Sequence, residues 1–221
     1  RWLCEQRGLD PVHLYGDLVR RYEAPRMKPP FNTAARKKAG FTDVELFAEH
    51  AERSGDFPNV PGHVSNPENP QVFAHIIQRA MATGAELILA TDPDCDRMGC
   101  AAKLTTAPSS PWATLSGNQL GVLLADFLLE QRARGRRVTS DQYVVKTLVT
   151  TEMIRRIAES YGVRTVGDLH VGFKYIGRTI DLEGPERFVI GCEESHGYLV
   201  GTHARDKDAA VAAMLLAELA A

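Results

Sequence analysis

Residues 71–99 read QVFAHIIQRAMATGAELILATDPDCDRMG, and this stretch decides the fold class. Its first part places apolar residues at helical spacing as far as Thr83, and Gly84 stands where a glycine often ends a helix. The run Leu87 to Ala90 is short, continuous and apolar, as in a parallel strand that is covered on both faces. A helix followed directly by a buried strand is typical of an α/β protein.

The same alternation continues on both sides of this stretch. Further strands are expected near 44–47, 100–104, 143–148, 163–166 and 187–190, and further helices over 117–131, 151–161 and 209–220. Residues 105–116 read as a polar turn region and residues 167–177 as a glycine-rich loop. A cluster of arginines within 132–137 divides the series. The sequence therefore predicts two consecutive three-layer α/β/α units with mixed, largely parallel sheets.

Composition excludes several classes of protein. The 221 residues are 44% hydrophobic and 24% charged, which supplies apolar material for one or two globular cores and argues against disorder. The formal net charge of -2 provides no positive field, so we expect neither nucleic acid nor a membrane as a partner. The four cysteines lack the paired spacing of zinc sites and are too few for a disulfide scaffold, which favours reduced thiols in a cytoplasmic protein.

The two ends of the sequence predict that the chain is a fragment of a longer protein. It begins at Arg1 and stops at Ala221 inside an apolar helical run without a glycine or proline stop. Residues 1–35 read as one or two helices and a proline-rich linker, and they stay unassigned. The two α/β units are then expected over 36–135 and 136–221.

The sharpest chemical feature is the acidic loop that follows the strand at 87–90. Asp92, Asp94 and Asp96 stand at alternate positions, where their mutual repulsion favours a cation between them. Oxygen ligands favour magnesium or calcium over zinc, and an incomplete set of three suits magnesium, which keeps positions for water or phosphate oxygen. An EF-hand is excluded because Lys103 stands where its final glutamate belongs. A phosphatase-type nucleophile loop and a solvated acidic turn stay open as alternatives.

A second acidic loop, from Gly191 to Gly197, also follows an apolar strand. In an extended segment Glu193 and Ser195 would point to one side and Glu194 to the other. A carboxylate beside a hydroxyl can hold two neighbouring sugar hydroxyls, and an ordinary acidic turn is the alternative explanation.

Two further segments carry positive charge. One of the two aspartates before the helix over 209–220 is a candidate N-cap, and Arg205 and Lys207 beside that helix start can receive an anion such as phosphate. In residues 171–177, glycines bracket aromatic side chains and Lys174, which suits a ligand loop or a plain turn equally.

Taken in order, these four motifs resemble the α-D-phosphohexomutase superfamily, which contains the phosphoglucomutases and phosphomannomutases. The resemblance runs from about Phe41 to the C-terminus, and Gly55-Asp56-Phe57-Pro58 and Asn66-Pro67-Glu68 also fit it. It implies an isomerase that moves a phosphoryl group between positions 1 and 6 of glucose or mannose, through a phosphoserine and a bisphosphorylated sugar. Its partners would be the hexose 1-phosphates, the 6-phosphates and the 1,6-bisphosphate. Residues 36–135 and 136–221 would correspond to the second and third domains of the family.

The resemblance implies catalytic and metal-binding roles for individual residues of the first acidic loop. Asp92, Asp94 and Asp96 would bind Mg²⁺, and Arg97 would be the adjoining active-site cation. Lys207, from the segment before the last helix, would be the second catalytic cation.

Substrate-binding roles follow from the same resemblance. Glu193 and Ser195 would contact sugar hydroxyls, and Lys207 would lie near the substrate phosphate. Gly172 and Lys174 would belong to a substrate loop, in which Val171 stands where the family often has a threonine.

Two elements of the family have no counterpart in this sequence. Neither the loop with the phosphorylated serine nor the phosphate-clamping Arg-x-Ser-Gly-Thr loop occurs, so we expect the chain alone to be inactive. Ser65 precedes Asn66 and Pro67, but its place ahead of the metal loop argues against a nucleophile. The general acid/base stays open among the residues His196, His203 and Lys207. A magnesium-dependent phosphatase with an aspartate nucleophile and a non-catalytic sugar-binding module are the alternative functions.

Overall fold

The computed structural model describes residues 43–51, 54–107 and 109–221. Everything predicted for residues 1–42, including the unassigned segment 1–35, lies outside these residues. The chain divides into two compact units, Arg1–Asn59 and Val60–Ala221, and each is described by itself.

The described part of the first unit is short and irregular. It contains the 3₁₀ turn η1 (Ala48–His50), and the side-chain amide of Asn59 donates a 2.9 Å hydrogen bond to the carbonyl of Glu49. The strand predicted over 44–47 is wrong, because Val44 and Leu46 are about half exposed and this segment belongs to neither sheet.

The second unit opens with a helix that ends as the sequence predicts. Two 3₁₀ turns, η2 (Pro61–His63) and η3 (Pro70–Phe73), precede α4 (Ala74–Thr83). Gly84 ends α4 with φ 76°, a left-handed conformation that costs glycine little because it has no Cβ.

A three-stranded antiparallel sheet follows α4, in the order β1 (Leu87–Thr91), β2 (Met98–Lys103) and β3 (Trp112–Leu115). The parallel pairing expected for the 87–90 run is wrong among the described residues, because the short loop 92–97 joins β1 directly to β2 and so reverses the chain. Strand β3 lies within the region 105–116 that was predicted to be a polar turn.

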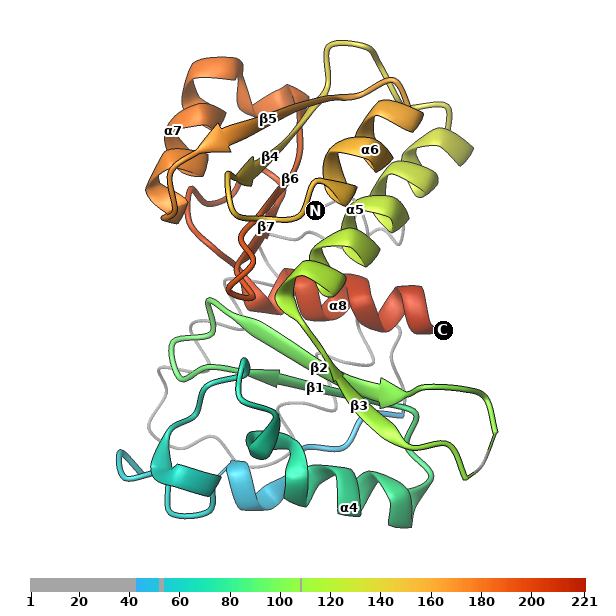
Figure 1. Cartoon of the computed structure of the whole chain (residues 1–221), viewed down its shortest axis with the longest axis vertical. Coiled ribbons are helices and arrows are strands. Elements are labelled where there is room, and N and C mark those ends of the chain that lie inside the picture. Colours follow the sequence, from blue (N-terminus) through green and yellow to red (C-terminus); the bar gives the residue numbers. More distant parts are fainter. Residues whose placement is uncertain (1–42, 52–53, 108) are drawn as a thin grey trace. The chain divides into compact units, whose positions relative to one another are not determined.

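A second, four-stranded sheet occupies the rest of the unit (Figure 1). Its order is β5–β4–β6–β7, with β4 parallel to β5 and β6 and with β7 antiparallel to β6. The strands are β4 (Tyr143–Thr147), β5 (Arg164–Leu169), β6 (Phe188–Cys192) and β7 (Tyr198–Val200). The helical elements are α5 (Gly117–Arg134), α6 (Met153–Ser160), α7 (Phe173–Glu183), η4 (Pro185–Arg187) and α8 (Ala209–Ala220).

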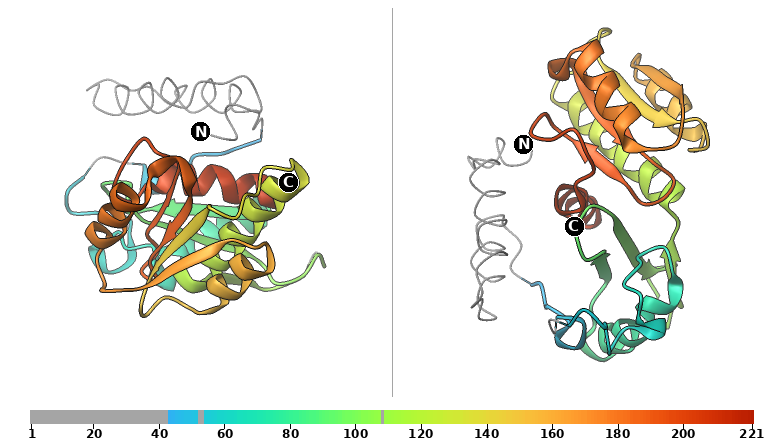
Figure 2. Two further views of the ribbon diagram at one scale, coloured as in Figure 1. Left: turned by 90° about the horizontal axis from the view of Figure 1, so that it is seen from above. Right: turned by 90° about the vertical axis from the view of Figure 1, so that its left-hand side faces the viewer.

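Helices cover both faces of this second sheet. Tyr143 and Val145 of β4 share a buried cluster with Phe173, Ile176 and Ile180 of α7. The alternate residues of β4 face the other side, where α5 and α6 pack against each other and against the sheet. This arrangement is a three-layer α/β/α unit, and Figure 2 gives two further views of it. The predicted α/β class with mixed sheets is confirmed.

The helix α7 replaces much of the glycine-rich loop predicted over 167–177, since β5 runs to Leu169 and α7 begins at Phe173. By contrast, α8 begins where expected, with the Asp208 side chain accepting a hydrogen bond from the backbone N–H of Val211. Helix α8 contacts β7 and α5 as well as β1 and β2.

Over the part of the chain that the structure describes, we find no helix with the length and apolar character that a membrane span needs.

Candidate active site

The loop between β1 and β2 is organised around one buried carboxylate. Asp92 is 4% exposed, and its Oδ1 accepts hydrogen bonds of 3.0 Å from the backbone N–H groups of Asp96 and Arg97. Its Oδ2 accepts a 2.7 Å hydrogen bond from Nε of Arg97. Cys95 adopts a left-handed conformation, with φ 59°, at the turn of this loop. The loop is therefore wound around Asp92, and its backbone geometry is fixed by that side chain.

The three aspartates of the loop converge as the alternate spacing predicts. One carboxylate oxygen from each of Asp92, Asp94 and Asp96 lies within 4.8 Å of the other two. Hard oxygen donors in this number fit magnesium, which binds through a few carboxylates and completes its shell with water or phosphate oxygen. The donor set therefore fits the ion that the sequence predicts, and Mg²⁺ itself remains a proposal.

The carboxylates of the loop are electrostatically crowded. Burial, the largest influence on Asp92, by itself raises its pKa, but hydrogen bonds from Arg97 outweigh burial and leave the pKa of Asp92 lowered. Burial raises the pKa of Asp96, and the neighbouring Asp92 adds to this effect while Lys207 opposes it. A carboxylate whose charge is disfavoured by burial and by a neighbouring carboxylate, as at Asp96, is one that a bound divalent cation would stabilise in its ionised form.

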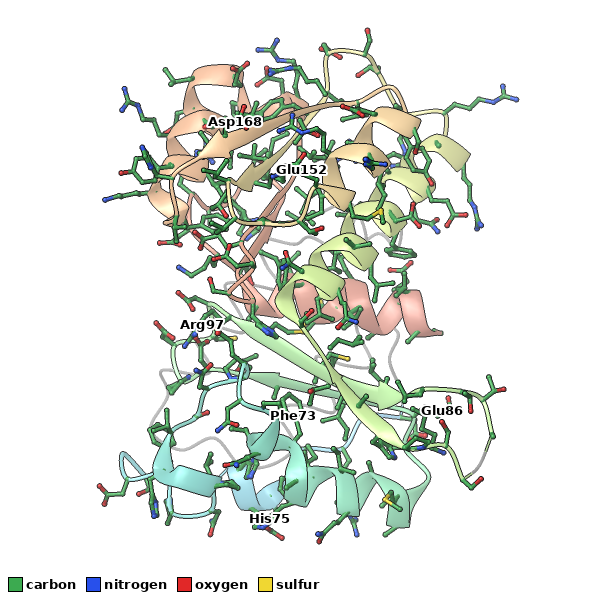
Figure 3. All side chains as sticks on the ribbon, in the orientation of Figure 1. Phe73, His75, Glu86, Arg97, Glu152 and Asp168 are labelled. Carbon is green, nitrogen blue, oxygen red and sulfur yellow. The ribbon has the colours of Figure 1, made fainter. Side chains whose placement is uncertain are left out.

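Glu68 joins this group, and it was not among the predicted site residues. Its Oε1 accepts a 2.8 Å hydrogen bond from Nη1 of Arg97, which stands beside the loop in Figure 3. The segment approaches closely because Gly99 has no side chain: a Cβ there would lie 2.7 Å from the carbonyl oxygen of Pro67. The signal in the sequence was the Asn66-Pro67-Glu68 segment itself, which fits the family pattern without revealing a partner.

The second acidic loop joins β6 to β7, and its first glutamate is held by the start of α7. Glu193 is 5% exposed, and its Oε1 accepts a 2.8 Å hydrogen bond from the backbone N–H of Gly172. Gly172 has φ 121°, which favours glycine there. Burial raises the pKa of Glu193, while the Gly172 hydrogen bond and the charge of Lys207 oppose this. Ser195 lies in the same loop and is partly buried.

Lys174 is placed differently from the rest of the predicted substrate residues. Its side chain is exposed in the first turn of α7, and its ammonium group lies 5.1 Å from the centre of the Tyr175 ring. Within the described residues no hydrogen bond or ion pair joins it to the two acidic loops.

Lys207 links the two loops. Its Nζ lies 2.9 Å from Oδ2 of Asp96 and 3.0 Å from Oδ1 of Asp206. Burial opposes its charge and is the largest influence, but the hydrogen bonds to these two carboxylates outweigh burial and raise the pKa of Lys207. Gly197 lies against it, because a Cβ at Gly197 would clash with the Lys207 side chain and would lie 3.4 Å from Oε2 of Glu193. The Lys207 ammonium group therefore contacts the first acidic loop at Asp96, and the Lys207 side chain packs against Gly197 of the second acidic loop.

The backbones of the two loops also pair directly. The N–H of Met98 donates a 3.1 Å hydrogen bond to the carbonyl of His196, and Arg97 and Gly197 form an isolated antiparallel bridge. Two loops 100 residues apart in the sequence, at Arg97 and Gly197, are thus held side by side.

The three candidates for the general acid/base are separated by their contacts. His196 is 5% exposed, its Nδ1 lies 3.2 Å from the carbonyl oxygen of Met98, and burial lowers its pKa. Nε2 of His203 lies 2.7 Å from Oδ2 of Asp208, the residue that caps α8. Lys207 differs from both histidines because its ammonium group contacts a carboxylate of the first acidic loop, at 2.9 Å from Oδ2 of Asp96.

Two family models of one kind together match most of the chain. Residues 116–221 match "Phosphoglucomutase/phosphomannomutase, alpha/beta/alpha domain III", and residues 30–105 match "Phosphoglucomutase/phosphomannomutase, alpha/beta/alpha domain II". The chain belongs to the α-D-phosphohexomutase superfamily. Residues 1–47 match a further model, "Protein of unknown function (DUF455)".

Individual phosphohexomutases show the same relationship. A phosphomannomutase of Mycoplasmoides pirum is 35% identical over 186 residues, which are 83% of this chain and 32% of that protein. A phosphoglucomutase of Staphylococcus haemolyticus is 36% identical over 174 residues, which are 78% of this chain and 30% of that protein. The solved structure of a phosphoglucomutase/phosphomannomutase family protein from Burkholderia thailandensis has a TM-score of 0.63 at 22% identity, over 86% of this chain and 36% of that one, and it shows the shared fold. The chain therefore spans about a third of the length of these curated relatives.

Proposed function

We propose that this chain supplies the second and third domains of a phosphohexomutase, over residues 36–135 and 136–221. The parent enzyme would interconvert hexose 1-phosphate and hexose 6-phosphate, with glucose or mannose as the sugar, through a phosphoserine and a bisphosphorylated intermediate. The observation that carries this proposal is the backbone pairing of Arg97 with Gly197, because it holds the loop with the metal-ligand pattern beside the loop with the sugar-binding pattern.

Asp92, Asp94 and Asp96 would hold Mg²⁺, which as a Lewis acid would offset negative charge on a phosphoryl group during transfer. Two basic side chains of the chain would also interact with negative charge. Lys207, at the edge of both loops, would bind substrate phosphate, and Arg97 would keep Asp92 ionised and correctly oriented.

Glu193 would bind the sugar. Its carboxylate is held by the backbone N–H of Gly172, so one oxygen is already oriented before substrate arrives. Ser195 would complete the contact, since a hydroxyl both donates and accepts hydrogen bonds. Recognition through two neighbouring hydroxyls tolerates either orientation of a hexose, as a reaction that exchanges positions 1 and 6 requires. Lys174, exposed in α7, would contribute only to a substrate that extends beyond these loops.

Binding of glucose 1-phosphate and mannose 1-phosphate to the 221-residue chain tests the proposal, measured by calorimetry with Mg²⁺ present. We expect weak, saturable binding of at least one of them. Glu193→Ala should abolish this binding, and Glu186→Ala, at an exposed glutamate within η4, should leave it unchanged. Equal binding by the wild-type chain and Glu193→Ala would contradict the assignment of the sugar loop.

The expected inactivity of the isolated chain is a separate test. Without the serine loop we expect no measurable conversion of glucose 1-phosphate to glucose 6-phosphate by these 221 residues. Conversion that is lost in Ser65→Ala would overturn this expectation and make Ser65 the phosphoryl carrier.

A cytoplasmic location stays a proposal that rests on the cysteine pattern. Cys95, Cys100 and Cys192 are free thiols in the structure.

A further inference from the structure

Lys146 is a fully buried charged side chain that the proposed chemistry does not use. It lies on β4, and all of its donors face acceptors: Nζ donates hydrogen bonds to the carbonyls of Thr150 (2.9 Å) and Thr147 (3.3 Å) and lies 2.6 Å from Oε1 of Glu152. Burying an ammonium group costs free energy unless the group is fully paired. The buried position of Lys146 therefore depends on these acceptors. Lys146 therefore fixes the turn that connects β4 to α6.

That turn presents two hydroxyl groups to the sugar loop. Oε2 of Glu194 accepts hydrogen bonds of 3.0 Å from Oγ1 of Thr147 and 3.1 Å from Oγ1 of Thr150, and the two hydroxyl oxygens are 2.7 Å apart. Thr147 and Thr150 are 0% and 2% exposed. Glu194 is thus held by the turn after β4, whereas Glu193 is held by Gly172 at the start of α7.

We propose that Glu194 is a positioning residue, which holds the loop 193–197 in the sugar-binding conformation through Thr147 and Thr150. This inference rests on the proposed function, because it assigns sugar contact to Glu193 and Ser195 on either side of Glu194. The loop needs such support: His196 holds a left-handed conformation with φ 67°, which is unfavourable for a residue with a side chain. Lys146 acts one step further away, through the turn that it fixes.

The ion pair of Lys146 with Glu152 closes the network at the start of α6, where Figure 3 labels Glu152. The hydrogen bond from Lys146 is the largest cause of a lowered pKa for Glu152, and Arg155 adds to it. The contacts therefore run from the Glu152 carboxylate to the buried Lys146, then to the backbone carbonyls of Thr147 and Thr150, whose hydroxyl groups bind Glu194.

The test compares threonine variants that differ by one hydroxyl group. In the 221-residue chain, Thr150→Val should raise the amide hydrogen-exchange rates of residues 193–197 about tenfold, because a hydrogen bond to a charged acceptor is lost. It should weaken binding of glucose 1-phosphate by a similar factor, and Thr150→Ser should restore both. Glu194→Ala should show the same loss if Thr150→Val does not fold.

Thr165→Val is the matched control. Thr165 lies on β5 of the same sheet, and its buried hydroxyl oxygen has no hydrogen-bond partner in the described part of the chain, so its loss should change neither readout. Equal exchange rates and equal affinities in Thr150→Val, Thr165→Val and the wild-type chain would overturn the positioning role. Failure of the wild-type chain to bind any hexose phosphate would overturn the proposed function alone, and the exchange rates would still decide the role of Glu194.

Discussion

The metal loop (residues 92–97) and the sugar loop (residues 193–197) have the same architecture and are stabilised in different ways. Each joins two antiparallel strands, and each turns through one non-glycine residue with positive φ, Cys95 in one and His196 in the other. The metal loop is held mainly by charge, through Arg97 and Lys207. The sugar loop is held by hydrogen bonds from neutral groups and by close backbone packing. In the proposed roles, the loop that would bind a cation pairs its carboxylates with nearby basic side chains, whereas the loop that would bind sugar hydroxyls is positioned by neutral hydrogen bonds and packing.

Among the substitutions that test how the two loops are held, Gly117→Ala is expected to lower the stability of the chain most. A Cβ at this first residue of α5 would clash with the carbonyl oxygen of Glu194 and would lie 2.7 Å from the backbone nitrogen of His196. Because these are backbone atoms that cannot rotate away, we expect a loss of about 3 kcal/mol in the free energy of unfolding, measured by urea denaturation.

Gly135→Ala, at the C-cap of the same helix, is the control. The atoms nearest to a Cβ there belong to the flexible side chain of Arg137, so the change should cost less than about 1 kcal/mol. Equal stability of the two variants would mean that close packing does not hold the sugar loop.

The next effect is expected from Asp92→Asn, which tests whether charge holds the metal loop. The substitution keeps the size of the side chain but removes the charge that pairs with Arg97, so we expect a loss of about 2 kcal/mol in stability without added metal. Asp168→Asn, at an aspartate whose side chain is 87% exposed, should cost less than about 0.5 kcal/mol. If both variants unfold at the same urea concentration, the metal loop does not depend on its buried charge.

The residues at the metal loop differ in how far the sequence could predict them. The converging aspartates were predictable because Asp92, Asp94 and Asp96 are local in sequence and their spacing carries the chemistry. Glu68 was not, because its partner Arg97 is 29 residues away and is reached only through the packing of Pro67 on Gly99.

Secondary structure shows a similar limit. The pattern of apolar residues predicted α4, α5 and α8, where a long amphipathic or buried run is present. It missed α7 because Gly172 and Gly177 read as loop glycines; a Cβ at Gly177 would in fact clash with the carbonyl oxygen of Arg205, which is a requirement of tertiary packing. It also missed β3 and β7, which are only four and three residues long and carry little periodicity.

The smallest effect concerns the junction of the two loops and depends on pH. Burial lowers the pKa of His196 below its ordinary value. As the pH falls, His196 is therefore protonated at a higher pH in the unfolded chain than in the folded chain. The stabilising contribution of His196 is therefore complete above about pH 6.5 and is lost as pH falls through the folded pKa. Urea denaturation between pH 7 and pH 5 should show a steeper fall for the wild-type chain than for His196→Gln. Parallel profiles would mean that His196 is not held in its neutral form.

Titration of the 221-residue chain with Mg²⁺ in a calorimeter tests the assignment of the metal loop most directly. Asp94 makes neither of the ion pairs that occupy Asp92 and Asp96, so Asp94→Ala removes a ligand without disturbing Arg97 or Lys207. We expect saturable binding at one site, weakened by about tenfold or more in Asp94→Ala and unchanged in Asp168→Ala. Equal magnesium affinity of the wild-type chain and Asp94→Ala would contradict the metal site and, with it, the proposed role of this chain in a phosphohexomutase.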